Sequence, residues 1–159
     1  MSLQNIKKLK ADKGFTIVEL LIVIVIIGIL AAITIVAYNG IQNRGKLSSA
    51  QATANSAIKK AEAYNAVNSS YPTTAANFDA TPESKITGSG IKFITTAPNS
   101  GNGADSILYQ ACTAPATLQG ARVQYFDFVA NGNAYSYGGS ISSANQASCT
   151  TWSTAFAAS

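Results

Sequence analysis

The sequence predicts an α+β fold, with one long N-terminal helix followed by a small antiparallel β-sheet. An almost wholly apolar run fills residues 15–37, and a helical apolar period continues from there to Tyr64. Short aromatic and β-branched runs, typical of strands, follow mainly after residue 104. We expect the apolar half of the helix to protrude and its second, amphipathic half to pack on the sheet.

The first segment, residues 15–42, is apolar enough to cross a membrane. Residues 15–37 contain one charged residue, Glu19. As a helix this run is about 34 Å long, enough for a hydrocarbon core of about 30 Å. Residues 1–14 carry four lysines and one aspartate, hence a net charge of +3. Positive charge on this side predicts a cytoplasmic N-terminus and an exported remainder.

The second segment, residues 43–68, predicts an amphipathic helix with a closely packing, alanine-rich face. Asn68, the serines after it and Pro72 end this helix. Its apolar stripe recurs at three- and four-residue steps and consists of Leu47, Ala50, Ala54, Ala57, Ile58, Ala61 and Tyr64.

The rest of the exported chain divides into a variable loop, residues 69–104, and a strand region, residues 105–159. The loop is rich in Ser, Thr, Pro, Gly and Asn. An Asn131-Gly132 dipeptide between two strand-like runs predicts a β-hairpin. The expected strands are Ile91–Thr95, Ser106–Cys112, Arg122–Ala130 and Asn133–Tyr137.

Composition excludes several classes of function. The formal net charge is +4, but the residues after Gly14 carry seven basic and six acidic side chains, so their net charge is only +1. Charge therefore does not indicate a nucleic-acid partner. The chain has no histidine and two cysteines, too few for a structural zinc site or a Ser–His or Cys–His catalytic pair. We expect no enzyme activity, no cofactor and no metal.

Three interpretations compete for the N-terminus. A secretory signal peptide has a shorter apolar stretch and a small-residue cleavage site after it, whereas no clear Ala-x-Ala site follows here. A simple uncleaved anchor explains the length but not Glu19, which is costly in a membrane. The stretch Lys13-Gly14-Phe15-Thr16-Ile17-Val18-Glu19-Leu20-Leu21 resembles the class III signal of type IV pilins and pseudopilins, and the likeness continues to Ala32.

The resemblance implies a pilin-like fold and a defined maturation. A prepilin peptidase would cut between Gly14 and Phe15, remove the leader 1–14 and methylate the new amine of Phe15. Glu19, one helical turn away, would pair with the amine of Phe15 in a neighbouring subunit. Many family members have proline where this chain has Val36, and their helix can melt between the position of Gly28 and that proline. Melting here is therefore an open question.

The resemblance also implies partners and location. The precursor would wait as a single-pass protein in the bacterial cytoplasmic (inner) membrane. An assembly ATPase and a membrane platform would then polymerise it with copies of itself into an extracellular surface filament. The first expectation is the major pilin of a type IV pilus serving adhesion, twitching motility or DNA uptake. The alternatives are a minor pilin, a type II secretion pseudopilin or, from another class, a membrane-anchored surface enzyme or binding module.

Three further candidate sites lie in the exported part of the chain: a cysteine pair, a group of acids and a set of aromatic residues. Cys112 and Cys149 lie in the exported part, where thiols oxidise, so we expect them to form a disulfide rather than remain two buried thiols. Calcium binding, known from major pseudopilins, would need the scattered acids Asp79, Glu83 and Asp105 to meet, and solvated carboxylates are the favoured alternative. Alternation along the strands places at least half of the aromatic residues in the core, which is favoured over a stacking surface for nucleic acid. The aromatic residues are Tyr125, Phe126, Phe128, Tyr135 and Tyr137.

Overall fold

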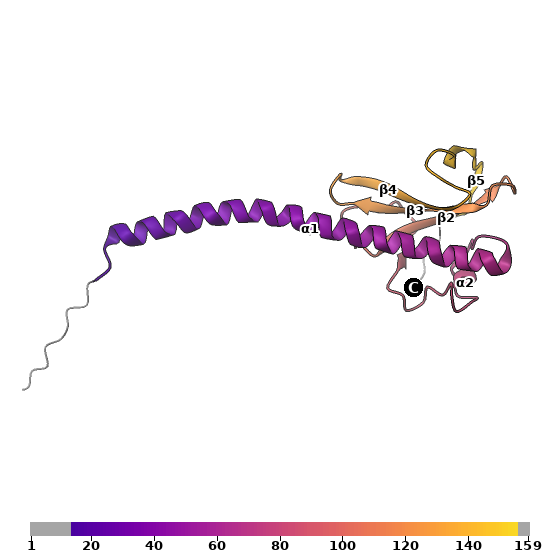
Figure 1. The fold of residues 1–159 in the computed structure, drawn as a ribbon, viewed down its shortest axis with the longest axis horizontal. Coiled ribbons are helices and arrows are strands. Elements are labelled where there is room, and N and C mark those ends of the chain that lie inside the picture. Colours follow the sequence, from indigo (N-terminus) through magenta and orange to yellow (C-terminus); the bar gives the residue numbers. More distant parts are fainter. Residues whose placement is uncertain (1–13, 156–159) are drawn as a thin grey trace, which may run out of the picture. The chain divides into compact units, whose positions relative to one another are not determined.

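The computed structural model describes residues 14–155 (Figure 1). Their contacts divide the chain into two units, which meet between Asn39 and Gly40. Helix α1 (Ile17–Asn68) is continuous, so the segment from Gly28 to Val36 is helical and not melted. The expected division of the helix into segments 15–42 and 43–68 falls within α1, and it stays a prediction.

The first unit contains the apolar part of α1. Every residue from 14 to 39 is exposed, although most of the side chains are Ile, Leu and Val. The helix satisfies its own backbone hydrogen bonds here, and its apolar side chains find no partner within this unit.

In the second unit, the alanine-rich face of α1 is buried as predicted. Ala54, Ala57 and Ala61 are 0% exposed, and Ala50 is 1% exposed. They share one core with side chains of the sheet, and Figure 1 shows β2, β3 and β4 beside this part of the helix. Small side chains allow the helix backbone to approach the sheet closely.

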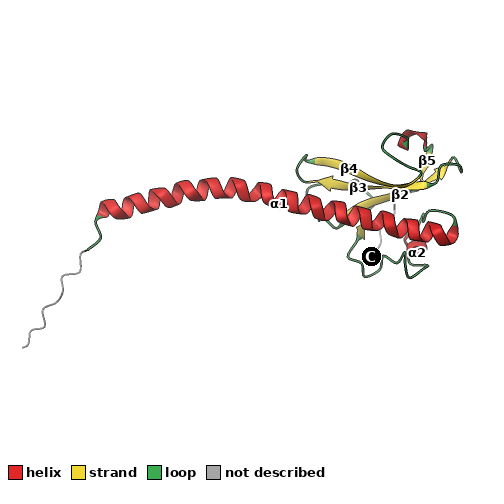
Figure 2. Ribbon diagram, in the orientation of Figure 1, coloured by secondary structure: helices red, strands yellow, loops and turns green. Residues whose placement is uncertain are grey.

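The sheet has five strands, shown in yellow in Figure 2. The order is β1-β2-β3-β4, and β5 pairs with β2. Strand β3 pairs along one edge of β2. The other edge of β2 pairs with β1 at its beginning and with β5 at its end. The strands are β1 (Lys92–Phe93), β2 (Ser106–Ala114), β3 (Gly120–Asp127), β4 (Gly132–Gly139) and β5 (Thr151–Trp152).

The expectation of an antiparallel sheet is wrong for one strand, β1. The neighbours β2, β3 and β4 are antiparallel, and so is β5, but β1 runs parallel to β2. The connection 94–105 explains the difference, since it is long enough to return the chain to the starting end of β1. The sheet is therefore mixed.

The hairpin expected at Asn131-Gly132 joins β3 to β4, but its loop is longer than a two-residue turn. Strand β3 ends at Asp127 rather than at Ala130, and residues 128–131 form the turn. The Oδ1 atom of Asp127 accepts hydrogen bonds from the backbone N–H groups of Val129 and Ala130, each at 2.8 Å. Asn131 takes a positive φ of 53°, which asparagine tolerates better than most residues.

An aromatic cluster fills the core beside the loop region. Phe78 comes from the four-residue helix α2 (Ala75–Phe78), which sequence analysis did not predict. Its ring lies 5.2 Å from Phe93 and 4.9 Å from Tyr109, centroid to centroid. Thr74 caps α2 through a capping box with Asn77. The loop 69–104 is thus anchored at Phe78 and at Phe93.

The end of β4 lies close against the helix in the second unit. A Cβ atom added at Gly138 would lie 2.5 Å from Ile58 Cγ2 of α1. The backbone N–H of Gly139 donates to Glu62 Oε1 at 3.4 Å, and Ser136 Oγ lies 2.9 Å from Asn55 Oδ1. The absence of a side chain at Gly138 lets the strand reach the helix.

Candidate functional site

The segment that carries the expected cleavage site precedes α1. Gly14 and Phe15 are exposed and non-helical, and the Phe15 side chain is 80% exposed. An added Cβ at Gly14 would meet no atom within 4 Å. The fold of this chain therefore does not require glycine at position 14. A glycine that the fold does not need is consistent with recognition by another protein.

Thr16 and Glu19 form a capping box at the start of α1. The backbone N–H of Thr16 donates to Glu19 Oε2 at 2.8 Å, and the Thr16 hydroxyl donates to the same oxygen at 2.7 Å. In return, the backbone N–H of Glu19 donates to Thr16 Oγ1 at 3.2 Å. Two N–H groups that the first helical turn leaves unpaired are satisfied in this way.

This cap was not predicted from the sequence, although the pattern Thr-x-x-Glu before an apolar run is its signature. Both hydrogen bonds from Thr16 go to one carboxylate oxygen, Oε2. The other oxygen, Oε1, accepts no hydrogen bond from residues 14–155. Glu19 can therefore hold the helix start and still offer an oxygen to a group from outside the chain. In the uncut chain the nitrogen of Phe15 is part of a peptide bond, so the expected ion pair between its amine and Glu19 stays a prediction.

The helix beyond this cap has the properties of a membrane span. Within residues 14–155, α1 alone is long and apolar enough to cross a membrane, and its apolar stretch lies near the N-terminus. None of that stretch is buried within the protein. Leu20, Ile24 and Ile27, for example, are 60%, 59% and 59% exposed. Such a surface is unfavourable in water, and it fits the apolar interior of a membrane.

The expected disulfide is present and organises the C-terminal region. Cys112 on β2 is bonded to Cys149, 37 residues later. Both are buried in a small cluster with Ile141, against which Tyr137 and Trp152 pack. The bond holds the chain where β5 begins, so Trp152 lies opposite Cys112 in the β2–β5 pair.

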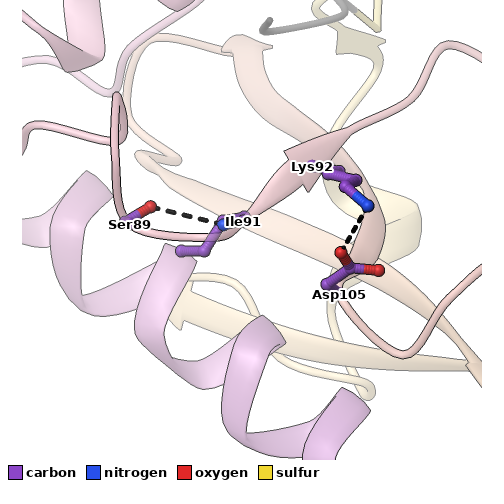
Figure 3. A network of polar contacts seen from close by, with 4 residues as sticks. All are labelled: Ser89, Ile91, Lys92 and Asp105. Carbon is purple, nitrogen blue, oxygen red and sulfur yellow. Dashed lines mark hydrogen bonds and ion pairs between the residues drawn. The ribbon is translucent and has the colours of Figure 1, made fainter.

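The three acids considered for calcium do not gather into a site. Asp79 accepts hydrogen bonds from Thr87 and from the backbone N–H of Ile86, and these lower the pKa of its carboxyl. Asp105, just before β2, forms an ion pair with Lys92 of β1 at 2.8 Å (Figure 3). Within residues 14–155, no group of three potential ligands is placed to hold a metal ion. Asp79 and Asp105 instead anchor the loop between α2 and β2.

The aromatic residues of the strands divide between the two faces of the sheet. Tyr125 belongs to the core against α1, and Phe128 packs at its margin. Phe126 is buried beside Phe128, with ring centroids 5.1 Å apart. Tyr135 is 39% exposed and stacks on Tyr137. Tyr125 and Phe126 are therefore buried as expected, Phe128 and Tyr137 are half-buried, and Tyr135 is the exposed member of the five.

Comparison with known families agrees with the geometry at the N-terminus. Residues 9–35 match the family model for the prokaryotic N-terminal methylation motif. No solved structure matches the chain. The matched segment includes Gly14, Phe15 and the Thr16–Glu19 cap, and the fold is a long helix with a small mixed sheet. The chain therefore carries the N-terminal methylation motif, the class III signal peptide of type IV pilins, on a pilin-like α+β protein.

Proposed function

We propose that this protein is the major structural subunit of a type IV pilus. The observation that carries the proposal is the methylation motif joined to the apolar first part of α1, a stretch in which no residue is buried within the described chain. Each Ile, Leu or Val side chain is stabilised by about 1.5–3 kcal/mol when it is fully removed from water. A helix with this many exposed apolar side chains is suited first to lipid and then to the core of a fibre.

Maturation is proposed to begin with hydrolysis of the Gly14–Phe15 peptide bond by a prepilin peptidase. Water adds across the bond, the leader leaves with a carboxylate on Gly14, and Phe15 gains a free amine. A methyl group from a methyl donor then replaces one proton of this amine. The exposed, non-helical backbone at Gly14 and Phe15 supports the proposal, because a protease needs an extended segment that it can reach.

In assembly, the carboxylate of Glu19 is proposed to form an ion pair with the N-terminal ammonium of Phe15 in a neighbouring subunit. The capping box leaves Oε1 of Glu19 available while Oε2 holds Thr16. Both charges are costly in an apolar medium when alone, and pairing with good geometry lowers that cost. Apolar packing tolerates many registers, whereas a buried ion pair favours one of them. The cap thus orients the carboxylate, and the pair selects the register.

The proposal extends to location and partners. The precursor would reside in the bacterial inner membrane, and an assembly ATPase with its membrane platform would add mature subunits to a surface filament. The sheet, the loop 69–104 and the disulfide region would then face solvent and determine adhesion, twitching motility or DNA uptake. A minor pilin or a secretion pseudopilin would carry the same motif. Such a subunit would differ from a major pilin in its abundance and in the length of the fibres that depend on it.

Imaging of surface fibres tests the proposal. Deleting the gene should remove all long fibres, and expressing it again should restore them with this chain as the main component. Fibres that persist but are shorter or fewer would instead assign a minor subunit. Unchanged fibres would contradict a role in a surface pilus.

A further inference from the structure

Arg122 occupies the face of the sheet that points away from α1. Its neighbours on β3, Ala121 and Val123, are both 0% exposed and belong to the core against the helix. Successive side chains of a strand point to opposite faces, so Arg122 projects to the other side. There it lies between Gln110 of β2 and Tyr137 of β4 in the strand register.

Its guanidinium group is held in a defined orientation. The Nε and Nη2 atoms of Arg122 donate to Gln110 Oε1 at 3.1 and 2.9 Å. The Cζ atom lies 4.1 Å from the ring centroid of Trp152 and 5.7 Å from that of Tyr135. Stacking on aromatic rings and a two-point hydrogen bond together fix the plane of the group.

The disulfide contributes to this orientation. Trp152 lies opposite Cys112 in the β2–β5 pair and packs on the Cys112–Cys149 cluster. The ring beneath the guanidinium is therefore fixed by a covalent link between the sheet and the C-terminal region. A group positioned before its ligand arrives loses less conformational freedom on binding.

Arg122 nevertheless has unused binding capacity. A guanidinium has five N–H donors, and Gln110 takes two of them. Within the described chain, the remaining three have no acceptor, and Arg122 forms no ion pair. The side chain is only half-buried, so an external ligand can reach it. The fork geometry of the free donors matches a carboxylate or a phosphate bidentately.

We propose that the Arg122 cluster, made of Gln110, Arg122, Tyr135, Tyr137 and Trp152, binds the carboxylate of an acidic polysaccharide. The free guanidinium donors hold the carboxylate. The exposed Tyr135 beside it supplies an apolar ring and a hydroxyl group, which suit a sugar that has C–H groups and hydroxyls. The other members of the cluster are uncharged amide and aromatic side chains.

The single charge of the cluster favours a uronate over a nucleic acid. Arg122 is the only cation of the Arg122 cluster, whereas nucleic-acid binding depends on neutralising several phosphates along a strand. The whole chain after Gly14 carries a net charge of only +1. One oriented guanidinium beside aromatic rings suits one carboxylate per sugar unit.

The fluorescence of Trp152 tests this inference, because Trp152 is the only tryptophan in the chain. The full-length protein in an uncharged detergent is titrated with trigalacturonate, and in parallel with the methyl ester of the same trisaccharide. The ester keeps the sugar rings and removes the negative charges. We expect a saturable change of Trp152 fluorescence with the acid and none with the ester at the same concentrations.

Variants assign the change to the cluster. Arg122→Gln should weaken trigalacturonate binding at least tenfold, and Arg122→Lys should weaken it by several-fold because the charge stays but the fork is lost. Arg44, the other arginine of the chain, is exposed on α1, so Arg44→Gln is the matched control and should bind as the wild type does. Circular dichroism and the retained disulfide establish that each variant is folded.

Several results would overturn the inference. They are the lack of a saturable change with trigalacturonate, equal binding of acid and ester, or equal loss of binding in Arg44→Gln and Arg122→Gln. Acetate binding as tightly as trigalacturonate would remove the sugar from the proposal. A single-stranded DNA oligonucleotide that binds more tightly than trigalacturonate would assign the cluster to nucleic acid instead. None of these outcomes depends on assembly of the chain into fibres.

Discussion

The glycine at position 138 provides a sharp test of the packing between the sheet and the second part of α1. A Cβ added at Gly138 would lie 2.5 Å from Ile58 Cγ2 and 3.1 Å from Glu62 Oε1. Gly132, at the other end of the same strand, is the matched control, because a Cβ there would meet no atom within 4 Å. Neither glycine has a positive φ. The variants Gly138→Ala and Gly132→Ala therefore differ chiefly in the contact with the helix.

The expected magnitudes follow from this contact. Both substitutions gain about 0.5–1 kcal/mol, because alanine in a strand restricts the unfolded chain more than glycine does. Only Gly138→Ala also overpacks the interface with Ile58, at a cost of about 1–3 kcal/mol. Gly138→Ala should thus be about 1–3 kcal/mol less stable than Gly132→Ala, which should be at least as stable as the wild type.

Urea unfolding of the full-length protein in mild detergent measures the difference, with Trp152 fluorescence reporting on the second unit. Repeating Gly138→Ala in an Ile58→Ala background should remove most of its cost, because the methyl group that it meets is gone. Equal stability of the two glycine variants would refute the close approach of β4 to α1. An unchanged cost in the Ile58→Ala background would show that Ile58 is not the residue responsible.

Two further predictions concern assembly and the disulfide. Glu19→Gln keeps a residue that can close a capping box but loses the charge, so it should be inserted and cleaved normally yet polymerise slowly or not at all. Glu19→Leu should assemble no better. Wild-type fibre yield from the leucine variant would refute the ion pair, and wild-type yield from the glutamine variant alone would assign Glu19 to capping only. Replacing Cys112 and Cys149 by Ser should destabilise the second unit by about 4 kcal/mol on the chain-entropy model, and non-reducing peptide mapping of wild-type fibres should find the two cysteines in one linked peptide. Free thiols in assembled protein, or unchanged urea stability of the serine variant, would contradict this.

The parts of the fold with a strong local period could be predicted from the sequence. The apolar run, the alanine face from Ala50 to Ala61 and the β3–β4 hairpin each depend on residues close in the chain. The parallel pairing of β1 with β2 depends instead on how the connection 94–105 returns across the sheet. The two-residue strand β5 is too short for a sequence signal, and it forms where the disulfide brings the chain to β2.

The candidate sites show the same division. Gly14, Phe15 and Glu19 lie in one short motif, so their roles could be proposed from sequence, and the cap between Thr16 and Glu19 had a local signature that could also have been found. The cluster around Arg122 had none. Gln110, Arg122 and Trp152 come from three strands, and only the register of the sheet and the disulfide bring them together.

The mass of the mature N-terminus tests the central claim most directly. Peptide mass spectrometry of protein recovered from surface fibres should find a chain that begins at Phe15 with one methyl group on its amine, and no peptide that contains the leader. Gly14→Val should leave the leader attached in the membrane fraction and give no fibres, because a side chain would obstruct a peptidase site shaped for glycine. A fibre protein that retains residues 1–14 or begins at another residue, or normal methylated Phe15 in the Gly14→Val variant, would contradict the account.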